Sequence, residues 1–221
     1  MQSNRQYTYQ RTDKPKEAGY SHELISDDTQ YIVERGATLD NLECVPANGC
    51  VTMLQNLRKQ IERIPNADFM GTRKGDTYEW LTWREAGEIA ENLSYGFMLH
   101  NLAPTVDAEG TDYRFNGLQS KNRKEWFLAS LANMHQKITS VSLYDTLGVD
   151  ATKFILDQTE LTTMVVANDY LVKLADLKIA DGKTDSPKVH RLANLVAMDS
   201  ELTDEQKAKC EEAGIKLFTM E

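Results

Sequence analysis

The feature that most constrains this chain is a regular alternation of strand-like and helix-like segments after residue 76. The strand-like segments are short and rich in β-branched, aromatic or continuous apolar residues, and helix-like segments of about ten to fifteen residues separate them. Because parallel strands need crossover connections of this kind, the pattern predicts an α/β fold with a mainly parallel sheet and helices on both faces. The predicted strands are 78–81, 115–119, 138–144, 163–167, 192–198 and 215–220.

Start and stop signals mark several of the predicted helices. Thr82 and Thr203 are each followed three residues later by Glu or Gln, which is the spacing of a capping box. Gly214 stands where a helix commonly ends in a left-handed glycine. The expected N-cap residues of four helices are Thr82, Asn122, Asp150 and Thr203.

The chain divides by polarity and hydrophobic pattern into an N-terminal extension, 1–50, and an α/β domain, 51–221. The first thirty or so residues are polar, dotted with tyrosine and without hydrophobic period, which predicts an extended arm that becomes ordered only against a partner. Apolar residues then recur at helical spacing between 51 and 64, and Pro65 marks the end of that helix. The segment 71–75, Gly-Thr-Arg-Lys-Gly, is expected to be a solvated basic loop. It lacks the spacing of a phosphate-binding loop.

Composition excludes several classes of partner. With 25 Lys and Arg against 34 Asp and Glu, the formal charge is −9, which disfavours nucleic acid because few cations are available to neutralise phosphates. The sequence contains no run of 18 or more apolar residues, so no transmembrane segment is expected, although peripheral membrane association stays open. The histidines are isolated from one another, which argues against a zinc site.

The three cysteines, Cys44, Cys50 and Cys210, form no Cys-x-x-Cys pair. This favours reduced thiols and an intracellular, cytosolic or mitochondrial, compartment. A disulfide between Cys44 and Cys50 is the alternative.

Five short motifs follow one another in the order of a known enzyme family. They are GTR at 71–73, YEWLTW at 78–83, SKNRKEW at 120–126, VSLYDTLG at 141–148 and QTE at 158–160. Together they resemble the N-terminal region of the long-chain acyl-CoA synthetases, which are members of the adenylate-forming, AMP-binding superfamily. The resemblance is clear from residue 69 to residue 166. It implies the N-terminal α/β subdomain of that superfamily.

The resemblance also implies a chemistry. The family activates a fatty acid with ATP and Mg²⁺ to an acyl-adenylate and then transfers the acyl group to coenzyme A. Its phosphate loop, its ribose-binding acidic residue and its C-terminal lysine all lie outside the region that matches, and no loop of the T-S-G-T-T-G type occurs in the sequence. The chain by itself is therefore expected to have no catalytic residue, no metal site and no cofactor. ATP, Mg²⁺ and CoA enter only if another polypeptide supplies the catalytic half.

The candidate site residues are the family-motif positions near two predicted strand ends. Asn122 to Trp126 lie where a strand leads into a helix, a place where ligands often bind in open α/β sheets. The structural alternative is that Asn122 and Glu125 cap the helix, Arg123 pairs with a neighbouring carboxylate and Trp126 packs in the core. The motif positions are Asn122, Arg123, Glu125, Trp126, Tyr144, Asp145, Thr146 and Gly148.

The sequence leaves two alternative functions of different classes open. The first is a non-catalytic, structural or accessory subunit of a larger protein complex, which keeps the fold of the family. The second is the N-terminal part of a split or longer long-chain fatty-acid CoA ligase, which predicts an exposed apolar sheet edge or face where the remainder would pack. A module that binds fatty acid or acyl-CoA is a third possibility.

Overall fold

The computed structural model describes residues 8–10, 24–26, 49–108 and 110–221. The chain divides into two units, Met1–Thr52 and Met53–Glu221. In the first unit, β1 (Thr8–Gln10) pairs antiparallel with β2 (Leu24–Ser26). The remainder of the predicted arm up to residue 48 lies outside the described residues, as does Cys44 of the conceivable disulfide.

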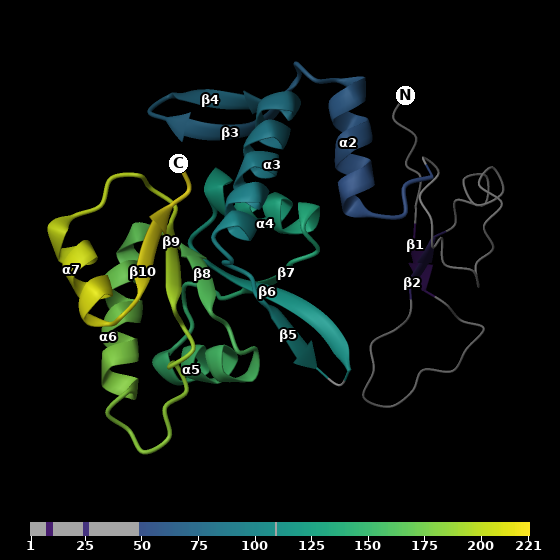
Figure 1. The fold of residues 1–221 in the computed structure, drawn as a ribbon. Helices are drawn as coiled ribbons and strands as arrows, with labels where there is room; N and C mark the ends of the chain where they lie inside the picture. Colours follow the sequence, from purple (N-terminus) through teal and green to yellow (C-terminus); the bar gives the residue numbers. More distant parts are fainter. Residues whose placement is uncertain (1–7, 11–23, 27–48, 109) are drawn as a thin grey trace, which may run out of the picture. The chain divides into compact units, whose positions relative to one another are not determined.

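A six-stranded sheet forms the centre of the second unit (Figure 1). Five strands run parallel in the order β10-β9-β8-β6-β7, so the predicted mainly parallel sheet is confirmed. A short strand that the sequence analysis missed, β5 (Thr105–Ala108), pairs antiparallel with the first part of β6. The parallel strands are β6 (Thr111–Gln119), β7 (Thr139–Ser142), β8 (Thr163–Val166), β9 (Asn194–Ala197) and β10 (Lys216–Thr219).

Helices cover both faces of this sheet, as predicted (Figure 1). On one side lie α5 (Val149–Gln158), α6 (Leu171–Asp181) and α7 (Asp204–Glu212), with the short 3-10 helix η1 (Asn168–Tyr170) leading into α6. On the other lie α3 (Trp83–Leu99) and α4 (Lys124–His135), and α2 (Met53–Arg63) packs on these two.

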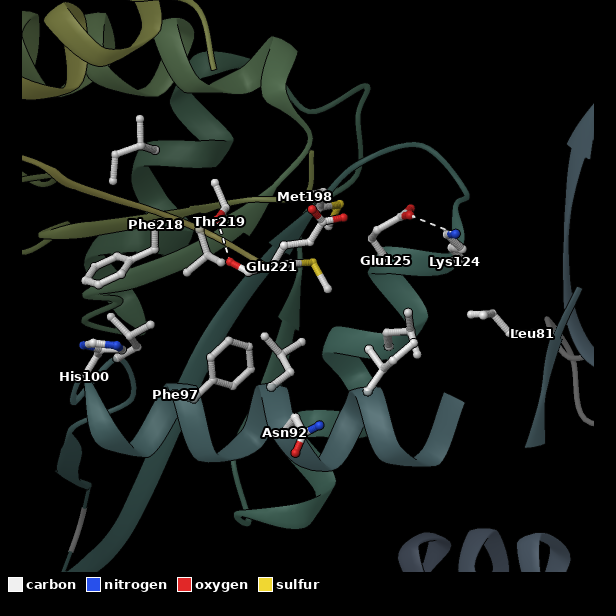
Figure 2. A pocket seen from close by; sticks show the side chains of 18 residues that line it. Leu81, Asn92, Phe97, His100, Lys124, Glu125, Met198, Phe218, Thr219 and Glu221 are labelled. Carbon is white, nitrogen blue, oxygen red and sulfur yellow. Dashed lines mark hydrogen bonds and ion pairs between the residues drawn. The ribbon is translucent and has the colours of Figure 1, made fainter. Parts of the chain in front are cut away.

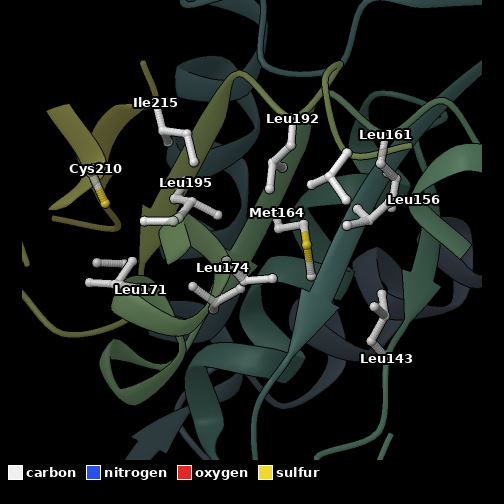
Figure 3. Packing of buried hydrophobic residues seen from close by; sticks show 14 residues of the cluster. Leu143, Leu156, Leu161, Met164, Leu171, Leu174, Leu192, Leu195, Cys210 and Ile215 are labelled. Carbon is white, nitrogen blue, oxygen red and sulfur yellow. The ribbon is translucent and has the colours of Figure 1, made fainter. Parts of the chain in front are cut away.

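Two hydrophobic clusters hold the helices to the sheet. The larger joins α5, α6 and α7 to β8 and β9, and it contains Met164 and Val166 (Figure 3). The second joins α3 and α4 to the opposite face and contains Val165. Every residue of β8 is buried, because successive side chains of a strand point to opposite faces and both faces are covered.

The expected caps are present at two of the four helices. Thr82 and Thr203 each form the complete capping box. Asn122 is not the cap of α4: the N-cap residue is Arg123, which makes no side-chain cap hydrogen bond. Asp150 lies in the first turn of α5, and Gly148 takes the cap position.

The prediction of a basic loop at 71–75 is wrong. This segment belongs to β3 (Asp68–Lys74), which forms an antiparallel hairpin with β4 (Thr77–Thr82), and the turn lies at Gly75 and Asp76. A Cβ atom on Gly71 would lie 2.8 Å from the ring of Trp80, so glycine allows this ring to lie across the neighbouring strand.

A buried carboxylate fixes the turn-rich segment after α6. Asp181 accepts hydrogen bonds from the backbone N–H groups of Lys188 and Val189 at 2.6 and 2.7 Å, and its other oxygen lies 3.4 Å from Lys153 Nζ. Burial alone would raise the pKa of Asp181, but the two backbone donors and Lys153 outweigh it, so the pKa is lowered. The carboxylate therefore stays ionised in the core.

The close approach of β6 and β8 gives a test of the packing. A Cβ atom on Gly117 would lie 2.7 Å from Met164 Cγ and 3.2 Å from Leu161 Cδ1, whereas one on Gly96 of α3 would meet nothing within 4 Å. Gly117→Ala should therefore lower the free energy of unfolding by about 1–3 kcal/mol through overpacking. Gly96→Ala should raise it by about 0.5–1 kcal/mol, since alanine is the better helix former. Urea denaturation of both variants measures the difference, and equal effects would contradict the packing shown here.

Candidate functional site

The carboxyl ends of the parallel strands form crevices on both sides of β6. The connection that leaves β6 leads to α4, whereas those that leave β7 and β8 lead to α5 and α6 on the opposite face. Neighbouring connections therefore diverge next to β6. In open α/β sheets this divergence is where ligands bind.

A pocket of about 510 Å³ occupies the crevice between β6 and β7. It brings together four of the eight motif positions, which are Asn122, Trp126, Tyr144 and Asp145, although the two motifs are separate in the sequence. The side chain of Tyr144 is exposed, and Trp126 also packs against the second hydrophobic cluster. The remaining lining residues are Ser120, Lys121, Ser142 and Leu143.

An ion-pair network crosses the ends of β6, β8 and β9. Arg123 donates from Nη2 and Nη1 to the two carboxylate oxygens of Asp199 at 2.5 and 3.1 Å, and from Nε to Glu125 at 2.6 Å. The expected pairing of Arg123 with a carboxylate is present. Because the Glu125 carboxylate accepts from Arg123, it does not reach back to cap α4.

Protonation in this network is set by the ion pair. The hydrogen bond from Arg123 lowers the pKa of Asp199, and the same hydrogen bond raises the pKa of Arg123. Both groups are therefore charged at neutral pH, and their bidentate geometry fixes the loop after β6 against the loop after β9.

Three polar residues of this region were missed by sequence reasoning. Asp199 follows directly on a buried apolar strand, and this position could have marked it. Asn168 donates to the carbonyl oxygens of Asp199 and Glu201 and accepts from the Asp199 N–H, which ties the end of β8 to the end of β9. Gln119, at the end of β6, carries a buried Oε1 that has no hydrogen-bond partner among the described residues.

The other motif positions have separate places. Thr146 and Gly148 lie in the connection from β7 to α5, where the Gly148 carbonyl accepts a hydrogen bond from the Thr152 N–H at 3.0 Å. Glu125 lines a different cavity together with Lys124. The motif at the start of α4 therefore faces two cavities rather than one.

This second cavity is an open groove of about 820 Å³ between α3 and the strands β9 and β10 (Figure 2). Phe97 points into it from α3, and the ring of Phe218 lies 5.2 Å from that of His100. Its polar lining consists of Asn92, His100, Lys124, Glu125, Thr219 and Glu221. Its apolar lining includes Ile89, Leu93, Phe97, Leu128, Met198, Leu217, Phe218 and Met220.

One wall of the groove is the edge of the sheet. Among the described residues, β10 pairs with β9 alone. The N–H groups of Lys216 and Met220 donate to Ala193 and Ala197 on the β9 side, so the backbone groups of Leu217 and Thr219 point away from the sheet. Unpaired backbone beside an apolar groove is an arrangement that another polypeptide can cover.

Metal-binding clusters and membrane-spanning helices are both absent from the described part of the chain. Residues 49–108 and 110–221, with the two short strands before them, contain no cluster of three or more His, Cys, Asp or Glu placed to hold a metal ion. Within the same ranges, each helix is too short or too polar to span a bilayer.

Comparisons with known proteins agree with the resemblance that the sequence motifs indicate. The human long-chain-fatty-acid–CoA ligase 6 is 33% identical over 116 residues, which cover 52% of this chain and 16% of the ligase. The peroxisomal acyl-CoA ligase 891 of Penicillium roqueforti is 32% identical over 123 residues, covering 52% of this chain and 17% of that protein. The guinea pig long-chain-fatty-acid–CoA ligase 1 is 27% identical over 173 residues, or 77% of this chain and 23% of the ligase. These three relatives are two long-chain-fatty-acid–CoA ligases and one acyl-CoA ligase.

The resemblance found in the motifs is thereby confirmed, although no family model matches the chain. The chain spans about a sixth to a quarter of the length of these ligase relatives, at 16% to 23%. Its fold matches the adenylation domain of a carboxylate reductase from Mycobacterium chelonae, with a TM-score of 0.58 and 15% identity over 76% of this chain and 28% of that one. A luciferase from Phrixothrix hirtus gives a TM-score of 0.52 at 14% identity, over 74% of this chain and 33% of that one. The expected α/β fold of adenylate-forming enzymes is confirmed.

The network around Arg123 gives a test by pH. The pKa of Asp199 is lowered in the folded protein, so its contribution to stability is present above its unfolded value of about 3.9 and is lost as the pH falls further. Because the pair is partly exposed, Asp199→Asn should lower the unfolding free energy at pH 7 by about 0.5–1 kcal/mol. The stability of this variant should also fall less steeply below about pH 4, because the carboxylate that titrates there is absent.

The matched control is Asp176→Asn, which removes an exposed carboxylate 3.2 Å from Lys209. It should change the unfolding free energy by less than about 0.5 kcal/mol. Thermal unfolding at several pH values compares the two variants. If Asp176→Asn lowers the unfolding free energy as much as Asp199→Asn does, the ion pair with Arg123 contributes no more stability than an ordinary surface ion pair.

Proposed function

We propose that this chain is a non-catalytic α/β subunit of the acyl-CoA ligase type that works inside a larger protein assembly. The observation that carries the proposal is the open, largely apolar groove beside β10, a strand that pairs with β9 alone among the described residues. A groove of this kind exposes side chains such as Ile89 that gain stability when a partner covers them. An exposed apolar edge or face is also what the interpretation as the N-terminal part of a longer ligase predicts, so the groove supports docking on a larger partner under either interpretation.

The chemistry of the family supports a role without catalysis. Forming an acyl-adenylate develops charge on phosphoryl oxygens, and its stabilisation needs converging backbone N–H groups and a cation. The segment 71–75 is the nearest match in composition, but it lies in an antiparallel hairpin where Gly71 serves to accommodate Trp80. We infer that the family's phosphate loop has no equivalent in these 221 residues.

A second candidate function is the N-terminal part of a split or longer long-chain fatty-acid CoA ligase. The match of the chain to only one part of much longer ligases favours it. In this case the groove would receive the remainder of the ligase, and ATP, Mg²⁺ and CoA would bind to the assembled enzyme.

Turnover by the isolated chain tests the absence of catalysis. The purified 221-residue protein should not consume a long-chain fatty acid in the presence of ATP, Mg²⁺ and CoA, because it has no phosphate loop to stabilise the transition state. Release of AMP and formation of acyl-CoA are measured directly, and calorimetry with ATP is run on the same preparation. Formation of acyl-CoA above the level without protein would overturn the proposal.

Complementation separates the two candidates. The chain is co-expressed with human long-chain-fatty-acid–CoA ligase 6 that lacks the 116 residues it shares with this chain. A stable complex without turnover is the result expected for an accessory subunit, and a complex with turnover is the result expected for a split ligase. Failure of the chain to form a complex with the shortened ligase would contradict the second candidate, the N-terminal part of a split or longer ligase.

Variants on one helix test the groove as the docking face. Ile89→Glu places a charge in the groove and should weaken the complex by at least about tenfold, because a buried unpaired carboxylate is costly. Leu99→Glu is the control, since Leu99 lies on the same helix and is 80% exposed. Its complex should keep the affinity of the unchanged chain, and equal weakening by both variants would mean that the groove is not the interface.

A further inference from the structure

The β3–β4 hairpin stands apart from the six-stranded sheet (Figure 1). It carries two exposed aromatic rings, those of Tyr78 and Trp80. Tyr78 and Trp80 are 55% and 50% exposed, and their rings stack with centroids 5.7 Å apart. Cross-strand partners share a face of a hairpin, and the partners of these rings are Arg73 and Gly71. These four residues, Gly71, Arg73, Tyr78 and Trp80, are called the aromatic face below.

Charge is distributed unequally between the two faces of the hairpin. Arg73 is the one charged side chain of the aromatic face, and it donates from Nε to the carbonyl of Gly75 at 2.9 Å, which folds it toward the turn. Glu79 is paired with Thr72 and therefore lies on the other face. The aromatic face is thus apolar at its centre and carries one cation, Arg73, toward the tip, where the turn also holds Asp76, in a chain whose net charge is −9.

The size of this surface favours a lipid over a protein partner. A stable protein interface buries about 800 Å² on each partner, which is more than two rings and one guanidinium on a narrow hairpin offer. Trp and Tyr, by contrast, are favoured at the boundary between lipid and water, where the ring is apolar and its polar group stays hydrated. Lys and Arg side chains beside them are attracted to anionic lipids.

We propose that the aromatic face docks this protein reversibly on an anionic lipid surface. Trp80 and Tyr78 enter the headgroup region, and Arg73 pairs with anionic headgroups there, while Lys74, on the other face of the hairpin, adds positive charge near the tip. Gly71 contributes because it lets the Trp80 ring lie flat over the strand instead of standing away from it. The attachment is weak, since it combines a small apolar insertion with few cations.

Vesicle binding tests this inference. The whole chain is mixed with vesicles of phosphatidylcholine alone and of phosphatidylcholine with phosphatidylserine, and binding is measured by sedimentation. Binding to the anionic vesicles is expected to be the stronger, with a blue shift of the tryptophan fluorescence that Trp80→Thr abolishes. The variants Trp80→Thr and Arg73→Glu should each weaken it by about fivefold or more.

Two variants elsewhere in the fold serve as matched controls. Tyr113→Thr removes an exposed aromatic ring from another strand, and Lys207→Glu makes the same change of net charge as Arg73→Glu on an exposed site of α7. Both should bind vesicles as the unchanged chain does. Circular dichroism and thermal unfolding confirm that all four variants are folded.

Several results would overturn the inference. They are no binding to anionic vesicles, undiminished binding by Trp80→Thr and Arg73→Glu, or equal losses for the two controls. If the unchanged chain does not bind vesicles, and Trp80→Thr and Arg73→Glu abolish the complex with the shortened ligase, the aromatic face is a protein interface instead. The vesicle assay contains no ATP or CoA, so its outcome is independent of the proposed lack of catalysis.

Discussion

The burial of β8 on both of its faces is the constraint on which the α/β unit depends. Met164 and Val166 belong to one hydrophobic cluster and Val165 to the other, so helices are required on both sides of the sheet. A chain that must supply helices to both sides has to send neighbouring connections in opposite directions. This divergence occurs beside β6, and the crevices at the ends of β6 are a consequence of how the core is covered.

The two crevices beside β6 are filled differently. On the side of β8 and β9, Arg123 and Asp199 close the crevice with a bidentate ion pair, and Asn168 holds the same strand ends together. A partly exposed ion pair contributes little net stability, but it fixes the direction of the chain as it enters α4. With Arg123 turned to that side, Asn122 and Trp126 lie toward β7, where a pocket stays open between them and Tyr144.

Local signals in the sequence were sufficient for much of this fold. The continuous apolar run at 163–167 and the capping boxes at Thr82 and Thr203 depend on residues only a few positions apart. The partner of Arg123 escaped prediction because it is distant in the sequence: Arg123 and Asp199 are 76 positions apart. The cap expected at Asn122 failed for the same reason, because a local capping pattern does not reveal that Glu125 is bound by Arg123, which Asp199 also holds.

The hairpin shows how one register serves two surfaces. Successive residues of β4 alternate between faces, so Leu81 lines the groove beside α3 while Tyr78 and Trp80 lie on the aromatic face. A slip of one residue would exchange these sets, exposing Leu81 and turning the rings toward the groove. Gly71 opposes this slip, because only glycine leaves room for the ring of Trp80 across the strand pair. A glycine that sequence reasoning assigned to a solvated loop thus keeps Leu81 and the aromatic face on opposite sides of one hairpin.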